Sequence, residues 1–115
     1  MEDIRLKTTT WHYADREWQL CCNMNVLADV QAIYGDLGSA LSGENTVRSV
    51  LDFLACMMND WADSQGWQVR YTGRELGRAL DWQSFQTVQA IVMELVAGAI
   101  TSETDESDPE DQGKN

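Results

Sequence analysis

Apolar residues between Val47 and Trp61 recur at spacings of three and four, and this pattern constrains the fold more than any other feature of the chain. They are Val47, Val50, Leu51, Leu54, Met58 and Trp61. Such spacing places these side chains on one face of an α-helix, which must pack against other parts of the chain. Thr46 is a candidate N-cap for this helix and Gly66 a candidate end. The sequence therefore predicts a long amphipathic helix in the middle of the chain.

Two short strands are expected before this helix and further helices on both sides of it. The β-branched and aromatic residues of Thr8–Tyr13 and Arg16–Cys21 predict a hairpin that turns at Ala14-Asp15. A lone hairpin is unstable and must pack on other elements. Before the central helix we expect a helix from the N-cap Asn23 to Gly35 and a helical turn at Leu37–Leu41. After it we expect an extended or irregular segment Trp67–Tyr71 and a short helix from Thr72 to Leu80 that opens with a Thr72–Glu75 capping box. The last helix is capped by Asp81, and its apolar stripe is Trp82, Phe85, Val88, Val92, Leu95, Val96 and Ala99. The predicted fold class is α+β, mainly α: a short N-terminal β-hairpin packed on a small bundle of about four helices.

Acidic residues dominate the charge of the chain. The net charge is -11, and the segment from Thr101 to Asn115 holds six of the 19 acids and one of the eight bases, which leaves -6 for residues 1–100. We expect one globular domain over residues 1–100 and a disordered acidic tail over 101–115. A negative field repels phosphate, so neither nucleic acid nor a membrane surface is expected as a partner. Met1 is followed by acids rather than by a basic and then apolar run, so we expect no signal peptide and a cytoplasmic location.

No residue pattern points to chemistry. Cys21 and Cys22 are adjacent and should face opposite sides of a strand, and Cys56 lies within the helical stripe, so all three are interpreted as small apolar residues. His12 is the only histidine, which argues against a multi-histidine metal site. We therefore expect no catalytic residue, no metal site, no cofactor and no enzymatic activity.

Three tryptophans are the candidates for contact with a partner protein: Trp61, Trp67 and Trp82. Trp61 and Trp82 belong to helical stripes, so a place in the core is the preferred interpretation for both. Trp67 follows Gly66 in an irregular segment and is the better candidate for an exposed anchor. Acids beside the stripes, namely Asp29, Asp52 and Glu94, are expected on solvated faces.

The order of these parts resembles a known family more than any single motif does. A hairpin leads through "WQLCCNMNVLADVQAIYG" into a helix closed by glycine, and "YTGRELGRALD" leads into the long last helix and the acidic tail. This arrangement resembles the tail assembly chaperones of long-tailed bacteriophages and prophages, over residues 4–100. The resemblance implies a protein that binds the long helical tape measure protein, keeps it soluble, helps to recruit tail tube subunits in the host cytoplasm, and is absent from the mature virion.

The resemblance also implies a longer form of the protein. Members of the family are often made in two lengths through a programmed ribosomal frameshift near the end of the short reading frame. Gln112-Gly113-Lys114 can be encoded by codons that contain a slippery run. Self-association through apolar helix surfaces is a further expectation.

Two other classes of function remain open on the sequence. An acidic inhibitor or DNA mimic that binds a basic protein would use the negative charge directly. Its acids should be laid out regularly on the folded surface, whereas much of the charge lies in the tail. An enzyme that uses thiol chemistry is the third class.

Overall fold

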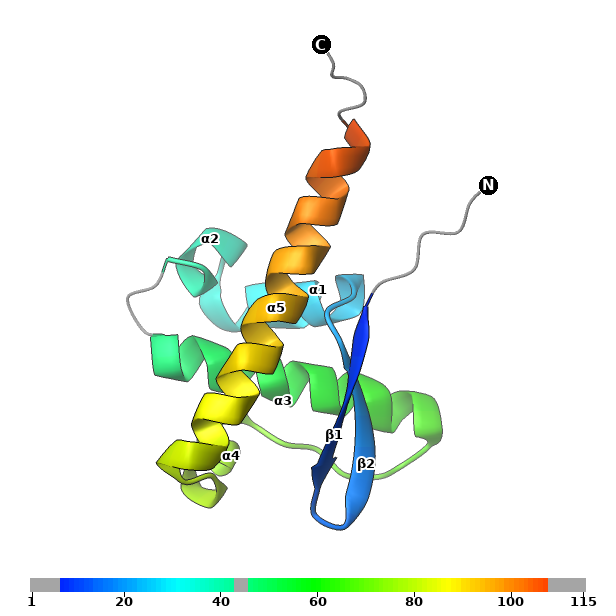
Figure 1. The fold of residues 1–115 in the computed structure, drawn as a ribbon, viewed down its shortest axis with the longest axis vertical. Helices are drawn as coiled ribbons and strands as arrows, with labels where there is room; N and C mark the ends of the chain where they lie inside the picture. Colours follow the sequence, from blue (N-terminus) through cyan, green and yellow to red (C-terminus); the bar gives the residue numbers. More distant parts are fainter. Residues whose placement is uncertain (1–6, 43–45, 108–115) are drawn as a thin grey trace.

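A two-stranded hairpin and five helices form the part of the chain that the structure describes, as predicted for an α+β fold. The structure is a computed structural model that describes residues 7–42 and 46–107, with side chains up to Ile100. Its elements are β1 (Thr8–Tyr13), β2 (Arg16–Cys21), α1 (Met24–Tyr34), α2 (Leu37–Ala40), α3 (Thr46–Gln65), α4 (Gly73–Ala79) and α5 (Trp82–Ser107). Helix α3 lies across the middle of the molecule, with α5 and the hairpin crossing it and α1 and α2 at one end (Figure 1).

The hairpin has the predicted strands and a strained turn. β1 and β2 pair antiparallel, with Trp11 opposite Trp18. Both turn residues have positive φ angles, 53° at Ala14 and 61° at Asp15. A two-residue turn with φ positive at both positions is the type I′ turn, which fits the twist of the strands but favours asparagine and glycine. The turn conformation is therefore imposed by the strand pairing on two residues that do not favour it.

Helix α3 is buried on all sides rather than along one stripe. Every residue from Ser49 to Met58 is buried, and so is Ala62. The reason is that α3 contacts β2, α1, α4 and α5, which together surround its central turns. A helix enclosed in this way is the centre of a fold and not one of its faces.

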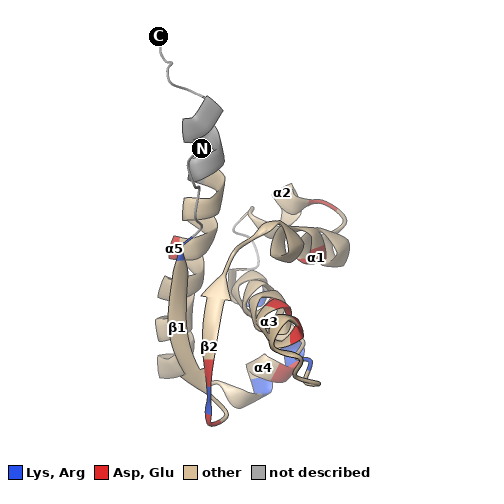
Figure 2. Cartoon of the chain, turned by 90° about the vertical axis from the view of Figure 1, so that its right-hand side faces the viewer, with Lys and Arg blue, Asp and Glu red and all other residues tan. Residues whose placement is uncertain are grey.

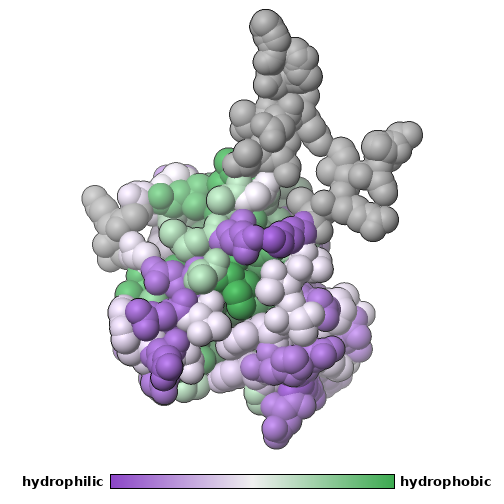
Figure 3. Space-filling model, viewed as in Figure 1, coloured by the Kyte–Doolittle hydropathy of each residue, from purple (hydrophilic) through white to green (hydrophobic). Residues whose placement is uncertain are grey.

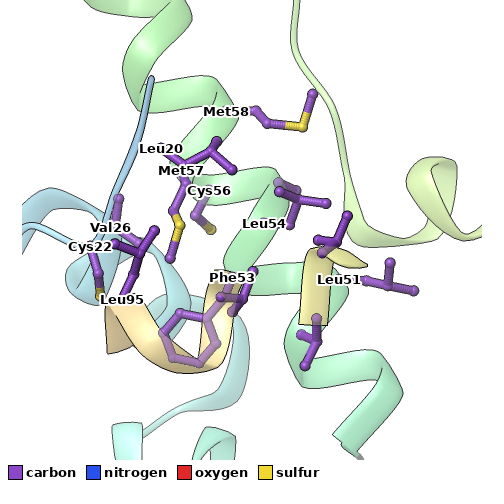
Figure 4. Close-up of a cluster of buried hydrophobic side chains, with 14 of the residues drawn as sticks. Leu20, Cys22, Val26, Leu51, Phe53, Leu54, Cys56, Met57, Met58 and Leu95 are labelled. Carbon is purple, nitrogen blue, oxygen red and sulfur yellow. The ribbon is translucent and has the colours of Figure 1, made fainter. Parts of the chain in front are cut away.

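The hydrophobic core is built around these α3 side chains. Figure 4 shows Leu51, Phe53, Leu54, Met57 and Met58 of α3 beside residues from the hairpin, α1 and α5. The residues contributed by those other elements include Leu20, Cys22, Val26 and Leu95. The core is thus shared by segments from both ends of the chain.

Local capping signals set most of the helix boundaries, as the sequence predicts. The Asn23 side chain accepts a hydrogen bond from the Val26 N–H at 3.0 Å, and α1 ends at Gly35 with φ 87°. Thr72 and Glu75 form both bonds of a capping box at the start of α4. Asp81 accepts from the Ser84 N–H at 2.8 Å at the start of α5. The Asn23, Thr72 and Asp81 caps satisfy backbone donors that a helix leaves open in its first turn, and the Gly35 N–H donates to the Gln31 carbonyl in the last turn of α1.

Helix α5 extends past residue 100, where the sequence places the end of the globular domain. It continues to Ser107. The remaining tail residues, 108–115, and with them the proposed frameshift site, lie outside the described residues. Within the described part of the chain, no helix is long and apolar enough to cross a membrane.

Candidate protein-binding surface

The three tryptophans singled out in the sequence occupy different environments, and Trp82 contradicts its prediction. Trp82 is 65% exposed, although a core position was the preferred interpretation. It is the first residue of α5, and its ring stacks on Phe85, with 5.5 Å between centroids. Phe85, one turn further along, is buried in its place. The buried face of α5 therefore begins at Phe85 and does not include Trp82.

Trp67 and Trp61 are both half-buried, so Trp67, the better candidate for an exposed anchor, is only partly accessible. The Trp67 ring packs edge-on against Trp18 at 5.2 Å, and the Arg16 guanidinium lies over it at 4.3 Å. These contacts assign Trp67 to the support of the hairpin. The Trp61 indole nitrogen is buried and has no hydrogen-bond partner among the described residues.

Exposed large hydrophobic side chains gather on one face of the molecule. The described part of the chain has seven of them: Met24, Ile33, Leu41, Val47, Trp82, Met93 and Ile100. Met24 and Ile33 belong to α1. The other five lie on α5 or beside it. Figure 3 shows hydrophobic residues on this face towards α2 and near its middle, interrupted by hydrophilic residues across the middle and bordered by more along the lower edge. Exposed apolar side chains that gather on one face are typical of sites of protein interaction.

Three of these residues form a straight stripe along α5, which we call the α5 stripe: Trp82, Met93 and Ile100. They are spaced by eleven and seven residues. At 3.6 residues per turn both spacings return to within about 20° of the same direction, so the stripe runs along the helix for about 27 Å. The stripe faces away from the side of α5 that is buried, which carries Phe85, Val88, Val92, Leu95 and Val96. Helix α5 thus has one apolar face in the core and three exposed apolar side chains along one line in solvent, with Gln86 and Gln89 between the first two.

Two apolar grooves flank the first turns of α3 and are bordered by the stripe. The α2 groove has a volume of about 80 Å³, and the α4 groove has a volume of about 160 Å³. Ala40, Leu41, Thr46, Ser49, Val50, Phe53, Val92, Met93 and Val96 line the α2 groove, and Val47, Leu51, Gly77, Leu80, Asp81, Trp82 and Phe85 line the α4 groove. Each groove therefore has exposed apolar side chains at its rim and buried ones at its base.

Most of the residues that form this apolar surface were not predicted from the sequence. Val47 was assigned to the buried stripe of the α3 helix, but it is 50% exposed. Leu41 and Met93 were not singled out at all. One signal in the sequence could have indicated an exposed apolar line. Met93 and Ile100 are large apolar residues that lie off the buried face of α5 and in line with Trp82. Their relation to Leu41 and Val47 depends on how α2, α3 and α5 pack, which the sequence does not state.

Charge is sparse along this surface. Between Trp82 and Ile100 the only charged residue is Glu94, which forms an ion pair with Lys7 at the start of the hairpin. Figure 2 shows charged residues on α3, α4 and the hairpin turn, whereas the part of α5 up to Ile100 carries Glu94 alone. Asp81, in the α4 groove, is held ionised because hydrogen bonds from Ser84 lower the pKa of its carboxyl. The surface is therefore uncharged along its length, with one carboxylate at the α4 end.

The cysteines have the environments of structural residues. Cys22 and Cys56 are buried and Cys21 is half-buried, and all three are free thiols. Burial raises the pKa of Cys22 to about 11 and that of Cys56 to about 12. Burial and the nearby Asp60 also raise the pKa of Cys21. Reactive cysteines are thiolates at neutral pH, so these three thiols are poorly suited to nucleophilic chemistry.

One acid contradicts its predicted place on a solvated face. Asp52 is buried, 7% exposed, and accepts a hydrogen bond from the Tyr34 hydroxyl at 2.8 Å. It lies against Gly73, the first residue of α4. The other two acids of that prediction, Asp29 and Glu94, are exposed as expected. The burial of Asp52 follows from the enclosure of α3, and its contacts make it a structural residue.

Comparisons with known proteins add no further assignment. No protein-family model, no curated protein and no solved structure matches the chain. Among the described residues, no three histidine, cysteine, aspartate or glutamate side chains gather where they could hold a metal ion. The features that bear on function are therefore the exposed apolar surface and the order of the hairpin, the helices and the acidic tail in the sequence.

Proposed function

We propose that this protein is a non-enzymatic tail assembly chaperone of a long-tailed phage or prophage, which binds the tape measure protein in the host cytoplasm. The observation that carries the proposal is the α5 stripe with its two grooves. Exposed apolar side chains in one line beside shallow apolar grooves suit a helix that docks through residues on one of its faces. A tape measure protein is a long helical client of this kind, and covering its apolar face would keep it from aggregating.

The acidic character of the chain supports this role in a second way. A chaperone that coats a client must keep the complex dispersed, and a net charge of -11 favours repulsion between complexes. Many copies along one client would bind with avidity, even where each contact is weak. Recruitment of tail tube subunits and a frameshifted longer form belong to the same proposal.

The placement of the acids favours a chaperone over an acidic inhibitor or DNA mimic. A mimic needs a regular array of carboxylates that are free to meet a partner, whereas most acids with described side chains are engaged within the chain. Asp36, Glu75 and Asp81 cap helices, Asp52 and Asp60 accept internal hydrogen bonds, and Glu17, Asp63 and Glu94 lie beside basic side chains. The apolar surface has no role in the mimic hypothesis.

Co-expression with the tape measure protein encoded by the same phage or prophage tests the proposal. We expect the tape measure protein to stay in the supernatant after centrifugation only when this chain is present. The double variant Trp82→Ser, Met93→Ser should lose this effect. The control Met24→Ser, Ile33→Ser removes two exposed apolar side chains from α1 and should retain it, because these residues lie off the proposed surface.

Two outcomes would contradict the chaperone assignment. One is a tape measure protein whose solubility does not depend on this chain. The other is a tight complex with a basic protein that dissociates as salt is raised, which would favour the acidic inhibitor because salt screens exposed charges.

A further inference from the structure

The spacing of the two grooves along α5 restricts what kind of helix can occupy them. Trp82 borders the α4 groove and Met93 borders the α2 groove. Eleven residues separate them, which is three helical turns or about 17 Å along the axis. A second helix packed alongside α5 at a shallow crossing angle would meet both grooves with side chains at nearly the same separation. Its two anchors would therefore also be eleven residues apart.

The two grooves differ in size and lining, so they select different anchors. The α4 groove, at about 160 Å³, is on the scale of an engineered cavity of ~150 Å³ that holds benzene. It is also bordered by the stacked rings of Trp82 and Phe85, which favour an aromatic partner. The α2 groove, at about 80 Å³, is lined mainly by aliphatic side chains and Phe53, with Thr46 and Ser49 beside them. It suits an aliphatic side chain such as leucine or isoleucine.

The surface between the grooves is polar but uncharged. Gln86 and Gln89 lie four and seven residues after Trp82, within about 40° of the line of the stripe. An amide side chain can donate and accept hydrogen bonds, so it meets a glutamine, serine or alanine more readily than a buried charge. Asp81, ionised and exposed at the α4 end, favours a lysine or arginine beside the aromatic anchor.

We propose that the surface binds a single amphipathic helix of stated pattern: an aromatic and an aliphatic anchor eleven residues apart, uncharged residues between them, and a basic residue in the turn of the aromatic anchor. The inference deepens the proposed function, because it names the segments of the helical client that this chain covers. The pattern also determines how the bound helix lies on the surface, because its aromatic and basic end must lie at the first turn of α5.

Synthetic peptides of about 20 residues test this pattern directly. The first peptide carries a phenylalanine and a leucine eleven positions apart, alanine and glutamine elsewhere, and two lysines in the turn of the phenylalanine. The second has the same composition with the anchors nine positions apart, which places them on opposite sides of the helix. Fluorescence anisotropy of labelled peptides should show at least tenfold tighter binding of the first.

Variants of the protein locate the bound peptide. Trp82→Ser and Met93→Ser should each weaken binding of the first peptide about tenfold, whereas Met24→Ser on α1 should leave it unchanged. Asp81→Asn should weaken binding several-fold and reduce its salt dependence, because asparagine keeps the helix cap but removes the charge. Circular dichroism of each variant checks that the fold is intact.

Three results would overturn the inference. The first is equal binding of both peptides, and the second is an equal loss of binding in Met24→Ser. The third is a dimer of this chain that Trp82→Ser dissociates, because a second copy would then cover the surface.

Failure of the proposed function can be distinguished from failure of this inference. If the tape measure protein binds but survives both stripe substitutions, the chaperone role stands and the helix pattern fails. If the first peptide binds as described and the tape measure protein does not, the pattern stands for a different client.

Discussion

Replacement of Gly73 by alanine should destabilise the protein, although the same change in most helices is favourable. A Cβ atom at position 73 would lie 2.1 Å from the Asp52 Oδ1 atom, against 3.4 Å for ordinary contact, a shortfall of about 1.3 Å. It would also lie 3.1 Å from the Asp52 backbone nitrogen, which cannot move independently of α3. Either the Asp52 side chain turns away or α4 shifts outward.

The cost follows from what each of those movements breaks. If Asp52 turns, it loses the hydrogen bond from the Tyr34 hydroxyl, a bond to a charged group that contributes about 1.5–3 kcal/mol. Overpacking against the α3 backbone costs about 1–3 kcal/mol more. The better helix propensity of alanine offsets about 0.5–1 kcal/mol. We expect Gly73→Ala to lower the free energy of unfolding by about 2–5 kcal/mol, and Tm by at least about 8 °C.

Urea denaturation followed by circular dichroism measures this change, and Gly77→Ala is the matched control. Gly77 lies in the same helix, but its added Cβ would meet only the Leu51 Cδ1 atom, at 3.4 Å. Gly77→Ala should therefore raise the free energy of unfolding by about 0.5–1 kcal/mol. On an Asp52→Ala background, Gly73→Ala should cost less than in the native chain, because part of the clash is gone. Equal, small effects of the two glycine substitutions would refute the close approach of α4 to Asp52.

Three further predictions concern the turn, a helix cap and the thiols. Asp15→Gly together with Ala14→Asn should raise Tm by a few degrees, because both residues then favour the positive φ angles of the type I′ turn; an unchanged Tm would argue against that turn. Thr72→Ala should lower the urea midpoint by the equivalent of about 1 kcal/mol, while Thr72→Ser, which keeps the cap, should not. Stability should fall as pH rises above 9, because an unfolded thiol ionises near 9.0 whereas the pKa values of folded Cys22 and Cys56 are about 11 and 12. Tm measured between pH 8 and 10.5 should fall less in the Cys22→Ala, Cys56→Ala variant.

Features set by neighbouring residues in the chain were predicted well from the sequence. The strands, the Asn23 and Asp81 caps and the Thr72–Glu75 capping box lie where the local pattern places them. Each depends on contacts within three or four residues, so no knowledge of the tertiary fold is needed to find it.

Features set by packing between distant elements were not predictable in the same way. Asp52 is buried and Val47 exposed because of the elements that cover α3, not because of their own neighbours in sequence. Trp82 was placed in the buried stripe of the last helix, but it lies in line with the exposed Met93 and Ile100 and not with the residues that reach the core. Composition and period indicate which face can be apolar, while the partner of that face depends on the whole fold.

The central position of α3 makes the folding of this protein an all-or-none process. Apart from the hairpin's own pairing and the contact of α1 with α2, the extensive contacts between elements all include α3. No group of elements that lacks α3 can assemble a core, so partly unfolded states should gain little from the contacts they retain. During synthesis the hairpin and α1 leave the ribosome before the helix on which they pack. A chain released before Gln65 would therefore have no stable structure, and α5, which carries the exposed residues Trp82, Met93 and Ile100, would dock last.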